Sequence, residues 1–181
     1  MSRTLADLMP REYQHLGVCV HESGHAVAAV ALGGVVRSAV VASGRVSGVQ
    51  GLTTLDTMPL ASEPLIAYAG PWSQGRWQAG RRPTQRQLFA LLDGGGRGDR
   101  DQLCAHGGSA AGLDVVPLLD RCWPGVVAVA KGLYRTGEVR QADVLAALGI
   151  TDGGGPGSVQ LASLRAGLRA VPNTRSGVTT G

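Results

Sequence analysis

Hydrophobic and polar positions along the chain predict a long helix followed by β-structure. From just after Pro10 to Leu32, apolar residues recur at helical spacing, and Gly33-Gly34 is a typical helix end. Two runs rich in β-branched residues follow at 35–42 and 45–55. Because Ser43-Gly44 lies between these runs, the pattern predicts a hairpin or a short sheet next to the first helix.

The remainder of the chain carries mainly helical patterns, divided by glycine-rich breaks. Helices are predicted at 60–80, at 84–93 behind a Thr84/Gln87 capping box, at 113–135 with interruptions at Pro117 and Pro124, at 142–148 and at 159–171. Residues 94–98 are expected to form a flexible glycine loop, with Asp99 as the cap of the next element. The fold class that follows is mainly α (α+β), a helical domain with a small sheet.

Composition and charge narrow the classes of function. The 181 residues are 44% hydrophobic, which is enough for the core of one domain without disulfides. The net charge is +4, but the arginines are scattered and form no basic stripe with stacking aromatic residues. We therefore expect no nucleic-acid partner.

The cysteines and the apolar runs indicate the compartment. No two of the three cysteines form a C-x-x-C pair, and a domain of this size needs no disulfide for stability. Both observations fit a reducing environment. The most apolar run, 26–36, is too short to span a bilayer. The first residues lack the apolar stretch of a signal peptide. The expected location is the cytoplasm, with no membrane contact.

The segment His21-Glu22-Ser23-Gly24-His25 carries the candidate chemistry. Residues four apart lie on one face of a helix, so the imidazoles of His21 and His25 can bind one metal ion. Zinc lowers the pKa of a bound water toward ~7, and Glu22 is placed to accept its proton. The motif predicts a zinc site for peptide hydrolysis with Glu22 as general base. Gly24 in mid-helix costs about 1 kcal/mol relative to Ala, which predicts a closely packed partner there.

A zinc ion of this kind needs a third protein ligand. The candidates are His15, His106, Glu63, Asp99 and Asp101. His15 precedes His21 by six residues and so faces another side of the helix, and Glu63 lies beside a proline at a helix start. The two aspartates follow a flexible loop and are the preferred source, with helix capping as the alternative role of either one.

The same residues resemble a known family. HESGHAVAAVALGG is similar to the HEAGHAVVA helix of the FtsH-type zinc metallopeptidases, the proteolytic half of membrane ATP-dependent proteases. Weaker similarities follow in the family's order. Gly51-Leu52-Thr53 is similar to a strand with a G-x-T pattern, and residues 67–71 are similar to a helix with the pattern L-A-G-R-A-A-E. Residues 98–103 are similar to an S-N-D-L-x-x-A segment, and residues 123–148 are similar to the closing helices of the family. The resemblance covers roughly residues 11–150, between an N-terminal segment (1–10) and a Gly-rich linker (151–158) with a short helix and disordered tail (159–181).

This resemblance implies a helical metallopeptidase domain with its small sheet beside the metal-binding helix. His21, His25 and an aspartate would hold zinc, and Glu22 would be the catalytic base. The aspartate is Asp99, with Asp101 as the alternative third ligand. Gln74 departs from the family, because it stands at the glutamate of A-A-E. The chain is expected to act without the family's ATPase module and transmembrane helices. The expected activity is therefore ATP-independent cleavage of flexible protein or peptide segments, alone or with a separate ATPase or regulatory partner.

Other hypotheses stay open. A small regulatory protease of the phage-repressor-cleaving type also carries an HExxH helix in a short chain. A non-catalytic relative could keep the metal site as a structural element or bind peptides in its groove, although a structural site gains nothing from Glu22. In the plainest hypothesis, the chain is a helical domain whose histidine pair binds no metal.

Overall fold

The computed structural model describes residues 8–44 and 48–173. In chain order the elements are α1 (Pro10–Ala31), β1 (Val35–Gly44), β2 (Gly48–Thr57), α2 (Glu63–Ala79), α3 (Gln85–Asp93), α4 (Arg97–Ala105), the 3-10 helix η2 (Ser109–Val115), α5 (Val116–Thr136), β3 (Glu138–Val139), α6 (Gln141–Leu148) and α7 (Val159–Arg165). The expected fold class, mainly α with a small sheet (α+β), is confirmed. Among the described helices, none is long and apolar enough to cross a membrane.

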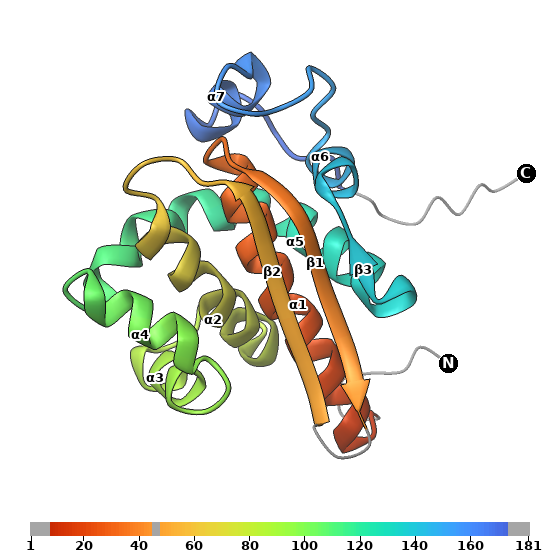
Figure 1. The fold of residues 1–181 in the computed structure, drawn as a ribbon, viewed down its shortest axis with the longest axis vertical. Helices are drawn as coiled ribbons and strands as arrows, with labels where there is room; N and C mark the ends of the chain where they lie inside the picture. The colour runs from red at the N-terminus through yellow and green to blue at the C-terminus, as the bar shows by residue number, and fades with distance from the viewer. Residues whose placement is uncertain (1–7, 45–47, 174–181) are drawn as a thin grey trace, which may run out of the picture.

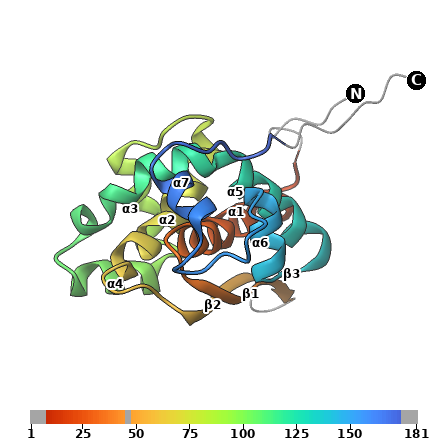
Figure 2. The same ribbon diagram turned by 90° about the horizontal axis from the view of Figure 1, so that it is seen from above.

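Helix α1 lies at the centre of the molecule (Figure 1 and Figure 2). The β1–β2 hairpin covers one side of α1, α2 a second and α5 a third. All residues from Glu22 to Ala31 are buried. A helix enclosed in this way needs small side chains, and this half of α1 is built mainly from alanine, valine, glycine and serine. The sequence thus allows three layers of structure to approach one helix.

The closest approach to α1 is made by α2. A Cβ added at Gly24 would lie 2.5 Å from the carbonyl oxygen of Ala69, well inside van der Waals contact. The closely packed partner predicted from this mid-helix glycine is therefore confirmed, and it is α2.

The sheet has the antiparallel order β2-β1-β3, so β2 is an edge strand. The expected hairpin or short sheet is confirmed, but Ser43 and Gly44 do not separate the strands, because Ser43 pairs with Val49 and Gly44 with Gly48. Residues 45–47, which include the expected start of the second strand, lie outside the described residues. The strand β3 is too short to show a sequence period, and only its pairing with Ala39 and Val40 defines it.

Helix α4 differs from the prediction in a way that affects the site. It begins at Arg97, so the glycine loop is shorter than expected. Asp99 lies inside the first turn of α4 instead of capping it. A carboxylate in this position is stabilised by the positive end of the helix dipole, and its side chain is free to face α1.

The later helices also depart from their predicted limits. Residues 113–115 belong to the 3-10 helix η2, and α5 starts only at Val116. The prolines do not interrupt α5: Pro117 lies in the first turn, where no backbone N–H is needed, and Pro124 is tolerated because the buried face of α5 holds the helix. Helix α7 ends at Arg165 rather than at residue 171, because Gly167 adopts a left-handed conformation with φ 76°.

Candidate metal centre

Helices α1 and α4 bring three candidate ligands together. His21 and His25 lie one turn apart on α1, and Asp99 on α4 faces both imidazoles. One ligand atom from each of the three residues lies within 4.8 Å of the others. The three side chains are only 10% to 15% exposed. Two imidazoles and one carboxylate are a donor set that can hold zinc, and also iron, manganese or cobalt.

The Asp99 carboxylate bridges the two imidazoles. Its Oδ2 atom lies 3.0 Å from His21 Nε2, and its Oδ1 atom lies 3.3 Å from His25 Nε2. Zinc binds imidazole nitrogen and carboxylate oxygen at about 2.0–2.1 Å, so neighbouring ligands of a tetrahedral site are about 3.3 Å apart. These two separations are compatible with a metal ion between the donor atoms.

Groups behind the imidazoles set which nitrogen faces the centre. His21 Nδ1 lies 3.0 Å from Gln74 Oε1, and His25 Nδ1 lies 2.8 Å from the carbonyl oxygen of Ile66. Both partners can only accept a hydrogen bond at these oxygens, so each Nδ1 carries the proton. The Nε2 lone pairs of both histidines are thereby left for a metal ion, as is usual for metal-binding histidines.

Strand β2 holds Glu22 from the other side. The Thr53 hydroxyl donates a hydrogen bond to Glu22 Oε2 at 2.7 Å. A Cβ added at Gly51 would lie 2.5 Å from Glu22 Oε1, so only glycine leaves room for the carboxylate. Glu22 is 6% exposed, and its side chain is fixed between α1 and the edge strand.

The pairing also determines the protonation of the centre. Burial disfavours the charged imidazolium of His25, but the Asp99 carboxylate outweighs burial and raises the pKa of His25 to about 9. Burial likewise disfavours the charged form of Asp99, yet the facing imidazoles hold its pKa below the ordinary value. A metal ion that binds here therefore competes with a proton for His25 Nε2.

The candidate ligands and Glu22 open into a pocket of about 360 Å³ between β2, α2 and the start of α4. A second hollow of about 820 Å³ adjoins it and shares His21, Glu22, Gly51 and Leu52. The edge strand β2 contributes to both hollows. Together they form a groove in which an extended chain could lie beside β2, with Glu22 at its middle.

The other ligand candidates lie elsewhere. His15 packs against Tyr134, with ring centroids 5.3 Å apart. The His106 side chain faces Glu63, with Nε2 3.6 Å from Oε2. Asp101 is exposed, and its Oδ1 atom lies 3.9 Å from Arg100 Nε. Within the described residues, the cluster consists of His21, His25 and Asp99.

The sequence predicts no orienting role for Gln74, Thr53 or the Ile66 carbonyl. Gln74 and Thr53 take part only in the family resemblance, and no sequence signal identifies the Ile66 carbonyl. Gln74 is 53 residues from His21, and Thr53 is 31 residues from Glu22. Such contacts depend on how α2 and β2 pack on α1, so local spacing carries no information about them.

Comparison with known proteins does not assign the chain to a family. No family model matches the chain, and no curated protein matches it.

Proposed function

We propose that this protein is a zinc-dependent endopeptidase that hydrolyses flexible protein or peptide segments without ATP. The observation that carries the proposal is the single constellation of His21, His25 and Asp99 with Glu22 beside them in an open groove. The similarity of the HESGH helix to FtsH-type metallopeptidases supports the same activity. We also propose that the protein acts in the cytoplasm, because the pattern of its cysteines fits a reducing environment.

The roles of the side chains follow from their positions. A zinc ion held by His21, His25 and Asp99 would lower the pKa of water and polarise the scissile carbonyl. Glu22 accepts a proton from the attacking water and passes it to the amine nitrogen as the C–N bond breaks. Thr53 keeps the Glu22 carboxylate oriented toward the groove.

The edge strand supplies a way to hold the substrate. An extended peptide can add to β2 as a further strand, and this main-chain pairing accepts many sequences. Folded segments cannot enter the groove in this form. Substrates are therefore flexible segments, or proteins unfolded by a separate ATPase or regulatory partner.

The first test is the metal content of the purified protein after zinc has been offered and free zinc removed. We expect about one zinc per chain, retained in Asp101→Ala and lost in His21→Ala and Asp99→Ala. Asp101→Ala is the matched control, because it removes a carboxylate two residues away on the same helix. A wild-type chain without zinc would overturn the proposal.

The second test is hydrolysis of an unfolded protein, followed by mass spectrometry of the fragments. Glu22→Gln should keep its zinc and lose about 10² to 10⁴-fold in rate, because it removes the general base. Cleavage by Glu22→Gln at the wild-type rate would show that the mechanism is wrong. Zinc-loaded wild type that cleaves nothing would instead favour a non-catalytic, peptide-binding role.

A further inference from the structure

One wall of the groove combines apolar side chains with a carboxylate. Beyond the metal centre, the pocket is lined by Leu55, Met58, Ile66, Glu63 and Gln102. The first three are apolar and face a space that is open to the groove, while Glu63 and Gln102 carry oxygen atoms that accept hydrogen bonds. A pocket that combines apolar side chains with hydrogen-bond acceptors suits a long aliphatic side chain with a cationic head.

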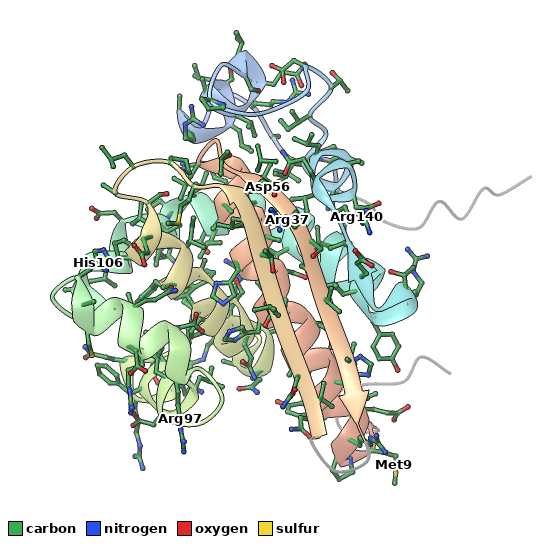
Figure 3. The ribbon with its side chains drawn as sticks, viewed as in Figure 1. Met9, Arg37, Asp56, Arg97, His106 and Arg140 are labelled. Atoms are coloured by element: carbon green, nitrogen blue, oxygen red, sulfur yellow. The ribbon has the colours of Figure 1, made fainter. Side chains whose placement is uncertain are left out.

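The charged residues around this wall, apart from histidines, are acidic. Apart from the histidines, the charged residues that line the pocket are Glu22, Glu63 and Asp99, and no described lysine or arginine lines it. Arg97 lies at one end of α4 and His106 at the other (Figure 3), and Arg100 is paired with Asp93 outside the pocket. Among the described residues, no arginine or lysine pairs with Glu63, whose side chain is 40% exposed and faces His106.

Glu63 is also close along α2 to a residue that contacts the candidate ligands. It lies one turn before Ile66, about 4.5 Å of helix rise, and the Ile66 carbonyl is the group that holds His25. Glu63 and the three candidate ligands line the same pocket. Lysine and arginine, with stems of three or four methylene groups, can place a charge well away from their own backbone.

Glu63 makes two interactions within the fold. It lies in the first turn of α2, where a carboxylate interacts favourably with the helix dipole. It also faces His106 at 3.6 Å, which is longer than a hydrogen bond. Both contacts position the carboxylate and leave it accessible from the groove.

We propose that Leu55, Met58 and Glu63 form a subsite for a basic side chain, so that the protein selects substrates with lysine or arginine at one fixed position next to the scissile bond. This inference rests on the proposed peptidase function and adds the class of substrate. Main-chain pairing with β2 provides general affinity, and Glu63 provides the selection.

The test compares two peptides that differ only at one position, lysine in one and norleucine in the other. Norleucine keeps the aliphatic stem and lacks the charge. The position is first located by cleavage of a mixed peptide library with the zinc-loaded full chain, where lysine and arginine should be enriched. We expect kcat/KM for the lysine peptide to be about fivefold higher, the upper end for a half-exposed ion pair. In Glu63→Gln this ratio should fall to about one, and in Glu63→Lys below one.

Glu138→Gln is the matched control, because Glu138 is 42% exposed and lies on β3, on the far side of the sheet from β2. Its lysine-to-norleucine ratio should equal that of wild type. Cleavage without preference for a basic residue, or a preference that survives in Glu63→Gln, would overturn the subsite and leave the peptidase function standing.

A binding measurement separates the two proposals when no cleavage occurs. Fluorescence anisotropy with the same two peptides is measured on zinc-loaded Glu22→Gln protein, with and without Glu63→Gln. Tighter binding of the lysine peptide that depends on Glu63 would support the subsite even if wild type cleaves nothing, and only the peptidase function would fall. Equal or absent binding of both peptides would overturn the subsite as well.

Discussion

The imidazoles of the candidate centre are oriented before any ligand arrives. His21 and His25 each donate their Nδ1–H to an oxygen of α2, and both Nε2 atoms converge on Asp99. Folding therefore orders the donors, and a metal ion that binds does not have to immobilise them. Groups that act through a ligand in this way commonly change metal affinity by about 10- to 100-fold.

Replacement of Gln74 tests this orientation. Gln74→Leu removes the acceptor of His21 Nδ1 and should weaken zinc binding by about 10- to 100-fold, measured by competition with a chelator. Gln74→Glu keeps an acceptor oxygen and should retain most of the affinity. Gln78→Leu makes the same change one turn along α2 at an exposed position and should have no effect. Equal affinities of Gln74→Leu and Gln78→Leu would contradict the role of Gln74.

The three cysteines differ in burial, and we expect their thiols to differ in reactivity as a result. Burial raises the pKa of Cys19 and of Cys122 to about 12, whereas Cys104 is exposed. Since the thiolate is the reactive form, a disulfide reagent should modify one thiol per folded chain and three after unfolding. Modification of Cys19 in the folded protein at the rate of Cys104 would be inconsistent with the buried position of α1.

At the scale of elements, the contact between α1 and α2 depends on two glycines. Gly24 admits the backbone of α2, and a Cβ at Gly70 would lie 2.3 Å from His25 Nε2, inside the imidazole. The close approach of the two helices brings the Ile66 carbonyl oxygen within hydrogen-bond distance of His25 Nδ1. The geometry of the candidate metal centre therefore depends on the packing of this helix pair.

Gly24→Ala should lower the free energy of unfolding by about 1–3 kcal/mol, because overpacking outweighs a gain in helix propensity of up to about 1 kcal/mol. Urea unfolding followed by circular dichroism measures this change. Gly98→Ala on α4 is the control, since a Cβ there meets no atom within 4 Å. It should be neutral or slightly stabilising. A Gly24→Ala protein more stable than wild type would contradict the close contact.

At the scale of the whole molecule, the C-terminal segment is attached to the central helix. Leu161 and Leu164 of α7 are fully buried, and Arg165 Nη1 donates a hydrogen bond to the carbonyl oxygen of Ala31 at 2.9 Å. In Figure 1, α7 lies beyond the end of α1, next to α6. The division of the chain at residue 150 stays a prediction, and these contacts provide a way to test it.

Leu161→Ala should destabilise the protein by about 2–5 kcal/mol, the usual cost of a cavity at a fully buried leucine. Thermal or urea unfolding of the full chain is the measurement. Leu168→Ala changes the same side chain three residues after Arg165, where it is 83% exposed, and should change stability by less than about 0.5 kcal/mol. Equal effects of the two substitutions would mean that α7 contributes nothing to the core.

Local periodicity determined several elements before any tertiary contact was known. The limits of α1, α2, α3 and α6 agree with the predictions to within about three residues, because caps and glycine breaks lie at their ends. The i,i+4 spacing of His21 and His25 places both on one face of α1, because an α-helix has about 3.6 residues per turn. Elements without a local signal, such as β3 and η2, exist only because neighbouring elements hold them.

Tertiary structure alone decided the remainder of the site. The sequence left Asp99 and Asp101 as alternatives, since both follow the same loop. The start of α4 at Arg97 and its packing beside α2 turn Asp99 toward the imidazoles and leave Asp101 in solvent. Gln74 and Thr53 reach the centre through contacts between elements far apart in the chain. Spacing within a helix specifies which side chains share a face, and only the packing of helices and strands specifies what that face meets.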